Sequence, residues 1–241
     1  VGPLSRPSKQ ANVSLGCEAH AGQAIHGMML VMRYAVGHKQ AVRERILQAA
    51  AAELRCKGLS GIGIPALMQR AGLTHGAFYA HFPSRDTLVA EAIRTAAAAS
   101  AAGPLADAHS LEECLAAYLA PEHLSHPERG CVIAALGGEG ARQPAPVRAA
   151  FAEAVRGLLA SIERKLHPRP APPAPSPAPS DEAPSGAPPS DEALRLVSAM
   201  VGAVLLARLV DDPALAQRLL AATACPTGGR TTQLKLADLH S

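Results

Sequence analysis

Half of the aromatic residues in this chain fall within five positions. The 241 residues include three Phe, three Tyr and no Trp, yet Phe78, Tyr79 and Phe82 stand together in AGLTHGAFYAHFPSRDTL, residues 71–88. Aromatic side chains bury more apolar area than any others. Because this chain has so few aromatic residues, the place where they cluster limits how it can fold. We expect this stretch to anchor a small core.

Two helices are predicted before the aromatic cluster. Apolar residues recur at helical spacing from Lys39 to about Lys57, with charged residues between them, and Gly58 is a suitable stop. Pro65 suits the first turn of a short second helix that ends near Arg70, because a proline at that position loses no hydrogen bond.

Two further helices follow from the capping residues. Thr74 is a good N-cap for a third helix over residues 74–82, and Ser84 is a good N-cap for a fourth. Two short helices joined by a glycine-containing turn make a helix-turn-helix, in which the second helix of the motif enters the DNA major groove.

The third helix is predicted to have one apolar and one open face. At about 100° per residue, Phe78 and Phe82 share one face, and Gly76 and Ala80 lie opposite. We expect the phenylalanines to anchor a core formed by Leu47, Leu67, Leu73, Phe78, Phe82 and Leu88.

The open face suits a DNA groove. Gly76 and Ala80 allow close approach of the backbone, and the Tyr79 hydroxyl is suited to a phosphate oxygen. The helix starts at Thr74 and Ser84 present free N–H groups to an anionic backbone. Residues 38–96 contain eight Lys/Arg and four Asp/Glu, whereas residues 97–224 contain ten and fourteen. This asymmetry is compatible with an anionic partner at one end.

Residues 43–91 closely resemble the DNA-binding domain of TetR/AcrR-type transcriptional regulators. Their recurring form, AG(V/L)(S/T)xGxxYxHFxSK(E/D)xL, is matched nearly position for position by residues 71–88. Arg85 replaces the usual Lys, Gly63 stands where Thr or Ser usually caps the second helix, and Met68 replaces a usual Ala. The resemblance implies DNA contacts by Lys39, Thr74, His75, Gly76, Ala77, Tyr79, Ala80, His81, Ser84 and Arg85.

The whole chain is predicted to be all-α, because it is 48% hydrophobic but poor in aromatic and β-branched residues. Similarity to the family, weaker beyond residue 100, implies about nine helices and a larger ligand-binding and dimerisation domain. The expected later helices are 110–120, 127–142, 145–166, 191–210 and 213–223. The expected domains are a disordered or non-native extension (1–37), the DNA-binding domain (38–84), the effector and dimerisation domain (85–225) with a proline-rich linker (167–190), and a flexible tail (226–241).

The last two expected helices resemble the pair that dimerises in the family as a four-helix bundle. The apolar face of the first of them is too broad for a lone surface helix, which independently favours a dimer; the alternative is a buried central helix of a monomer. The predicted interface is Leu194, Val197, Val201, Val204, Leu205 and Leu209.

No cofactor, metal or catalytic residue is predicted. The five cysteines show no metal-site spacing. His109, His123 and His126 lack a helical pair on one face, so we interpret them as solvated loop residues. Cys114 and Cys131 are interpreted as small buried side chains, with a thiol sensor as the alternative. No segment is long and apolar enough to span a membrane, and we expect a soluble, cytoplasmic protein with no membrane partner.

The sequence therefore predicts a transcriptional regulator, most often a repressor in this family, and not an enzyme. Its expected partners are a palindromic operator in double-stranded DNA, a second copy of the chain and an unknown small-molecule effector whose binding releases the DNA. One alternative is a helical small-molecule-binding protein or enzyme with a vestigial DNA-binding head. Another is a sequence-nonspecific DNA-binding or structural protein, which the modest charge disfavours.

Overall fold

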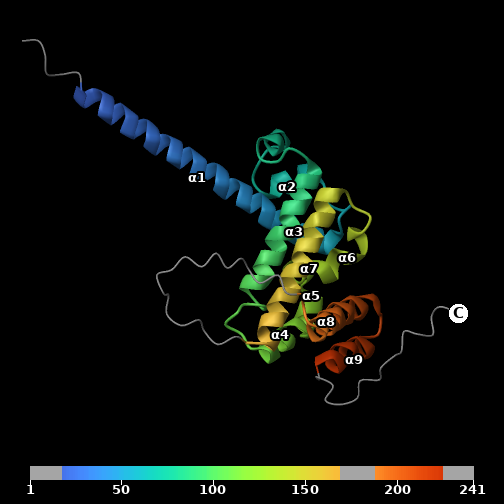
Figure 1. Ribbon diagram of the computed structural model, residues 1–241. Coiled ribbons are helices and arrows are strands. Elements are labelled where there is room, and N and C mark those ends of the chain that lie inside the picture. Colours follow the sequence, from blue (N-terminus) through green and yellow to red (C-terminus); the bar gives the residue numbers. More distant parts are fainter. Residues whose placement is uncertain (1–17, 169–187, 225–241) are drawn as a thin grey trace, which may run out of the picture. The chain divides into compact units, whose positions relative to one another are not determined.

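The computed structural model describes residues 18–168 and 188–224, and every regular element in these ranges is a helix (Figure 1). The all-α prediction is confirmed. Backbone contacts divide the chain into two units, Val1–Glu44 and Arg45–Ser241, and each is described by itself. None of the helices described is both long and apolar enough to cross a lipid bilayer. The predicted tail, residues 226–241, and most of the proline-rich linker lie outside the described residues.

Helix α1 spans Glu18–Lys57. The predicted start at Lys39 is wrong, and so is the prediction that residues 18–37 lack regular structure; residues 1–17 lie outside the described part. Residues 18–37 have no regular apolar stripe, which is why periodicity missed them. They do contain four Ala and three Met and no proline, and these residues favour a helix.

The helix-turn-helix region, residues 45–84 and called the head below, follows the predicted turns. Gly58 ends α1 with φ +79°, and α2 (Ile64–Arg70) carries Pro65 in its first turn and has Gly63 as an N-cap without a side-chain hydrogen bond. Gly72, at φ +74°, turns the chain after α2. Glycine adopts both positive φ values without strain.

The third helix differs from its prediction in type. Residues His75–Ala80 form a 3-10 helix, η1, and Thr74 precedes it without a capping hydrogen bond from its side chain. The amide of Ala77 donates to the carbonyl of Thr74 at 3.1 Å, which is the tighter 3-10 pattern. Pro83 disfavours helical geometry at the residue before it.

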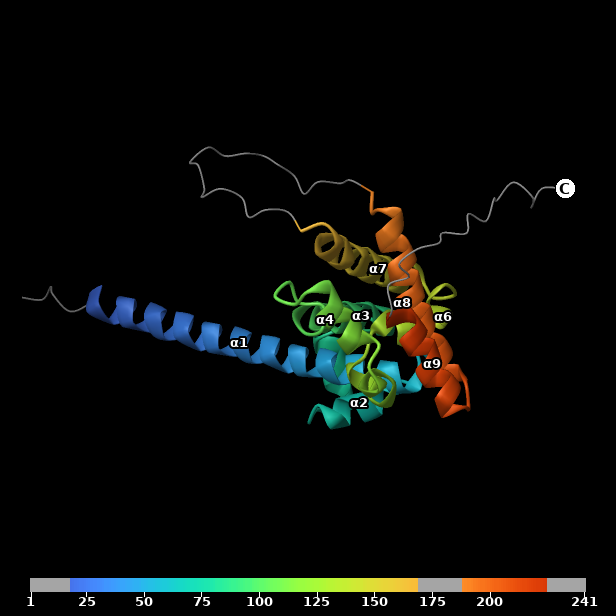
Figure 2. The same ribbon diagram turned by 90° about the horizontal axis from the view of Figure 1, so that it is seen from below.

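After the head, the second unit continues with helices that pack against one another (Figures 1 and 2). Helix α3 packs along α7, and α8 packs along both α7 and α9. Ser84 caps α3 as predicted, accepting from the Thr87 amide at 3.1 Å. The elements are α3 (Arg85–Ala102), α4 (Leu111–Tyr118), α5 (Pro121–Ser125), η2 (Pro127–Arg129), α6 (Val132–Gly140), α7 (Ala145–Leu166), α8 (Asp191–Leu209) and α9 (Pro213–Ala224).

The predicted helix 127–142 is wrong. The chain instead forms η2, then an extended Gly130 at ψ −179°, then α6, and the short α5 before them was not predicted. Around this extended residue the backbone groups form hydrogen bonds with side chains from other parts of the chain. The Gly130 carbonyl accepts from Arg55, and the Cys131 amide donates to the ring of His123.

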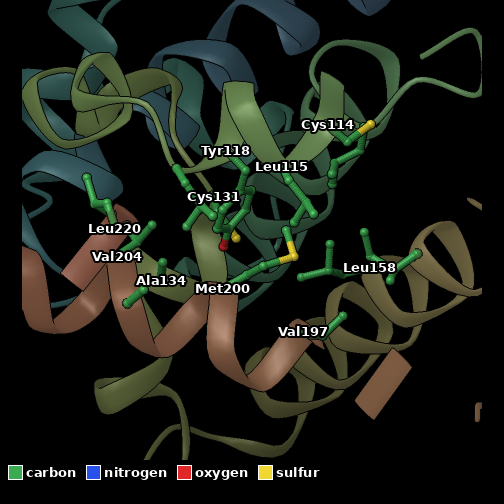
Figure 3. Packing of buried hydrophobic residues seen from close by; sticks show 14 of the residues in the cluster. Cys114, Leu115, Tyr118, Cys131, Ala134, Leu158, Val197, Met200, Val204 and Leu220 are labelled. Atoms are coloured by element: carbon green, nitrogen blue, oxygen red, sulfur yellow. The ribbon is translucent and has the colours of Figure 1, made fainter. Parts of the chain in front are cut away.

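The core of the larger helical part lies between α4, α6, α7, α8 and α9 (Figure 3). Tyr118 and Met200 lie at its centre, and Figure 3 shows the Tyr118 hydroxyl beside the sulfur of Cys131. Burial raises the pKa of the Tyr118 phenol. Val197 and Val204 belong to this same core, at 7% and 0% exposure.

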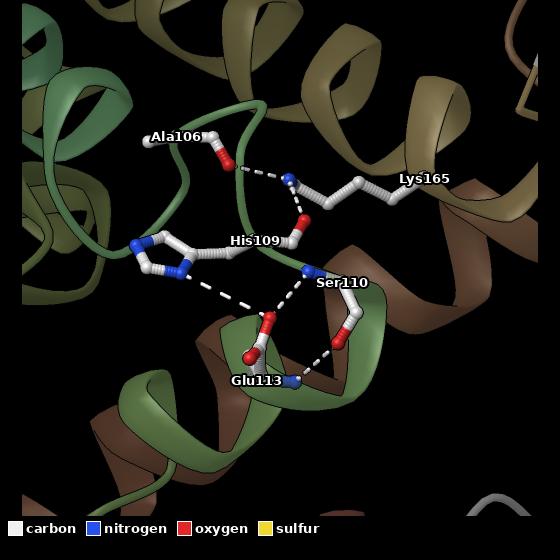
Figure 4. A network of polar contacts seen from close by, with 5 residues as sticks. All are labelled: Ala106, His109, Ser110, Glu113 and Lys165. Atoms are coloured by element: carbon white, nitrogen blue, oxygen red, sulfur yellow. Dashed lines mark hydrogen bonds and ion pairs between the residues drawn. The ribbon is translucent and has the colours of Figure 1, made fainter.

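The connection between α3 and α4 is fastened to α7 by a polar network (Figure 4). Ser110 and Glu113 form a capping box at the start of α4, with bonds of 3.1 and 2.7 Å between side chains and backbone amides. The Lys165 ammonium of α7 donates to the carbonyls of Ala106 and His109, both at 2.7 Å. These bonds hold the loop between α3 and α4 against the C-terminal end of α7.

Candidate nucleic-acid interface

The aromatic cluster separates into a buried pair and an exposed ring. Phe78 and Phe82 are fully buried and stacked, with ring centroids 5.8 Å apart. Tyr79 is 69% exposed, and its ring meets the edge of Phe78 at a centroid distance of 5.1 Å. The buried phenylalanines hold η1 in place, and Tyr79 stands on the outer surface of the same turn.

Most of the predicted DNA-reading residues are accessible. Ala77 and His81 are half-buried, and a Cβ added at Gly76 would meet no atom within 4 Å, so the backbone there is open to a close partner. The exposed members are Thr74, His75, Gly76, Tyr79, Ala80 and Ser84.

The core predicted beneath this surface is mostly buried. Leu73 is half-buried, because it lies in the turn before η1. The other five, namely Leu47, Leu67, Phe78, Phe82 and Leu88, are at most 7% exposed. Met68, which departs from the family pattern, is fully buried beside Leu67.

Arg85 has a structural partner that the sequence did not indicate. Its guanidinium donates to the carbonyl of Leu59, in the loop between α1 and α2, and the residue is half-buried at the start of α3. This bond ties that loop to the segment that follows η1. A phosphate contact by its other N–H groups stays a prediction. Lys39 is exposed and lies in the first unit.

A buried carboxylate joins the first two helices of the head. Glu53 is 3% exposed and pairs with Lys57 at 2.6 Å and with Arg70 of α2 at 3.4 Å. A buried charge of this kind is tolerated only when it is paired. Glu53 therefore fixes α2 against α1, which sets the position of η1.

A second carboxylate connects the head to the larger helical part. Glu139 of α6 accepts from the amide of Leu59 at 3.0 Å, and a Cβ at Gly58 would come within 2.8 Å of its Oε1. The backbone of Leu59 is thus held at both of its polar groups: its N–H donates to Glu139 of α6, and its C=O accepts from Arg85.

A further set of contacts joins α1, α5, α6 and α8; we call Arg55, His123, Gly130, Cys131 and Arg208 the junction. Arg55 donates to the Gly130 carbonyl at 3.1 Å, and Arg208 donates to the His123 carbonyl at 2.7 Å. A Cβ on Gly130 would lie 2.7 Å from the His123 ring, so any other residue here would have to displace that ring. The sequence shows no local signal for these contacts, and the predicted solvated role of His123 is wrong.

The His123 ring makes the junction sensitive to pH. Its Nε2 accepts from the Cys131 amide at 2.8 Å, so the neutral ring carries its proton on Nδ1, which lies 2.6 Å from the Tyr118 carbonyl. Burial, assisted by the charges of Arg208 and Arg55, lowers the pKa of His123. The unfolded chain therefore binds this proton more readily than the folded one does.

We expect the free energy of unfolding to decrease as the pH falls from about 6.5 through the lowered folded-state pKa of His123, because protonation removes the bond to Cys131. His123→Gln should remove this part of the pH dependence, measured by denaturant unfolding between about pH 7.5 and pH 5. His75→Gln, at an exposed position, should retain it. The same pH profile in the wild type and in His123→Gln would contradict this role.

Within the described residues, no three His, Cys, Asp or Glu side chains gather to hold a metal ion.

Comparison with known proteins identifies the head. Residues 46–92 match the family model described as bacterial regulatory proteins, tetR family. No curated protein matches the chain in sequence.

Solved structures match most of the chain. The reduced form of NemR from E. coli is 20% identical, with a TM-score of 0.56 over 76% of this chain and 93% of that one. A TetR-family regulator from Cytophaga hutchinsonii is 17% identical, with a TM-score of 0.57 over 78% and 93%. One from Chloroflexus aurantiacus J-10-FL is 24% identical, with a TM-score of 0.53 over 78% and 94%. At these identities the likeness concerns the fold. Residues 46–92 thus match a DNA-binding domain of the tetR family of bacterial regulatory proteins, and most of the chain shares its fold with solved TetR-family structures.

Proposed function

We propose that this protein is a repressor that binds a palindromic operator as a homodimer and is released from it by a small-molecule effector. The observation that carries the proposal is the arrangement on η1, where Tyr79 is 69% exposed directly beside the buried Phe78. An exposed tyrosine offers a partner both a large apolar ring and a hydroxyl that can form a hydrogen bond.

In the proposed complex, η1 enters the major groove. Gly76 and Ala80 let the backbone come close to the bases, and His75 and Tyr79 contact base edges or phosphates. The remaining predicted contacts, including Lys39 and Arg85, hold the phosphate backbone. Two heads of a symmetric dimer read half-sites about one helical turn apart.

The proposed dimer forms through the outer face of α8 and α9. The interface predicted from sequence needs correction, because Val197 and Val204 lie in the chain's own core and Val201 is half-buried against it. The apolar residues of α8 lie on both its inner and its outer face, and the sequence pattern did not distinguish between these faces. The large apolar residues that remain exposed on these helices are Leu194, Leu205, Leu206, Leu209 and Leu215.

The proposed effector site is a cavity of about 280 Å³ between α3, α6 and α7. Its wall includes Cys131, Val132 and Ile133 at the start of α6, and the far end of α6 carries Glu139 against Leu59 of the head. A ligand that favours one position of α6 therefore favours one position of the head. Such a difference in affinity between two conformations is all that allosteric release requires.

Substitution of the exposed residues of η1 tests the proposal. We expect Tyr79→Ala and His75→Ala each to weaken operator binding about ten- to a hundredfold without lowering the stability of the protein. Binding is measured by fluorescence anisotropy on the operator, and unfolding is measured in parallel. Wild-type affinity in both variants would show that η1 does not read the DNA.

A further inference from the structure

We propose that the cavity between α3, α6 and α7 takes a small, uncharged, apolar molecule, and that the effector belongs to this chemical class. That this molecule is the effector rests on the proposed function, whereas its chemical class follows from the residues that line the cavity.

The wall of the cavity is almost entirely hydrocarbon. Small side chains from α3 and α7 line its sides, and larger aliphatic side chains close it. Because alanine and glycine methyls and methylenes offer neither donors nor acceptors, they contribute contact area without polar recognition. The aliphatic residues that close the cavity are Leu105, Val132, Ile133 and Leu158.

The two charged side chains on the wall neutralise each other. Arg94 of α3 donates to both carboxylate oxygens of Glu153 of α7, at 2.5 and 2.9 Å. Each side chain is nearly half exposed, which places the ion pair where the cavity meets solvent. The hydrogen bonds from Arg94 lower the pKa of Glu153. Neither charge is therefore left over for a ligand of opposite sign.

The hydroxyl groups on the wall are also occupied. Ser100 donates to the carbonyl of Ala96, and Ser161 donates to the carbonyl of Leu105, both at 3.2 Å. The Cys131 thiol is a further polar group on the wall, and it is a weak donor that lies beside the Tyr118 hydroxyl (Figure 3). A polar ligand would lose its bonds to water in this cavity and gain no strong ones in return.

The volume limits the size of the ligand. A protein cavity of about 150 Å³ holds benzene, so the present cavity of about 280 Å³ suits a molecule with roughly twice that volume. A bicyclic hydrocarbon or a chain of roughly eight to ten carbons meets this requirement.

The test compares three probes that share one chain and differ in charge: 1-octanol, octanoate and octylammonium. Each is titrated into the DNA-free protein by calorimetry near neutral pH. We expect octanol to bind at least about tenfold more tightly than either ion, because only the ions must give up a hydrated charge.

Two variants on α7 test the place of binding. A Cβ at Gly157 would meet no atom within 4 Å, although this residue lies on the cavity wall. Gly157→Leu should fill the cavity and weaken octanol binding at least about tenfold without harming the helix, since leucine is the better helix former. Ala152→Leu adds a side chain at an exposed position of α7 outside the wall, and should leave octanol binding unchanged.

Octanoate or octylammonium binding as tightly as octanol would overturn the inference, and so would no binding of octanol or equal binding by Gly157→Leu. Operator binding is measured separately on the same samples. Octanol that binds as described without releasing the operator would support the cavity chemistry and contradict the proposed release. Absence of sequence-specific DNA binding would contradict the proposed function alone.

Discussion

Replacing Phe78 by alanine is expected to lower the free energy of unfolding by about 3–5 kcal/mol. The side chain is fully buried, stacks on Phe82 and supports the ring of Tyr79, so its removal leaves a cavity at the centre of the head. Denaturant unfolding followed by circular dichroism measures the change.

The adjacent residue provides the matched control. Tyr79→Ala removes a ring of similar size from an exposed position, and we expect its unfolding free energy to stay within about 0.5 kcal/mol of the wild type. The two variants are thus expected to affect different properties: Phe78→Ala lowers the stability, and Tyr79→Ala lowers the affinity for the operator. Equal losses of stability in both would show that the two rings do not play separate roles.

If the proposed dimer forms through α8, replacing Leu206 and Leu209 together by glutamate is expected to dissociate it and to weaken operator binding about 10²- to 10⁴-fold, because each head then binds its half-site alone. Both side chains are exposed on α8, Leu209 at 73%, so the change leaves the chain's own core intact. Sedimentation measures the molecular mass, and anisotropy measures affinity for the operator.

A charge added elsewhere controls for the dimer experiment. Ala99→Glu places the same charge at an exposed position of α3 and should leave both the mass and the affinity unchanged. If the double α8 variant stays dimeric, the outer face of α8 is not the interface, and the pairing surface must be sought on another helix.

Much of the fold was predictable because it depends on local signals. Gly58, Pro65 and Ser84 mark helix ends through backbone geometry and capping, and each does so in the structure. The predicted helix over residues 145–166 has the bounds of α7, since its apolar stripe is regular and proline precedes it. The buried phenylalanines and exposed Tyr79 of η1 also follow from spacing, although the helix is of the 3-10 type.

The rest depends on contacts between distant residues. Arg55 meets Gly130, and Glu139 meets Leu59, across 75 and 80 positions of sequence, and neither pair has a spacing that periodicity detects. The same limit explains the dimer prediction, because Val204 and Leu205 are neighbours in an apolar run but face opposite environments. Sequence thus placed the head but not the contacts that connect it to the cavity.

The central claim is that η1 reads a specific DNA sequence in a symmetric dimer. Binding of the purified protein to a pool of random duplexes, with the enriched sequences retested at several salt concentrations, tests it most directly. We predict a palindromic sequence that remains bound much more tightly than random DNA as the salt concentration rises, because contacts to bases depend less on salt than contacts to phosphates. Binding that shows no sequence preference and disappears with salt would contradict the claim.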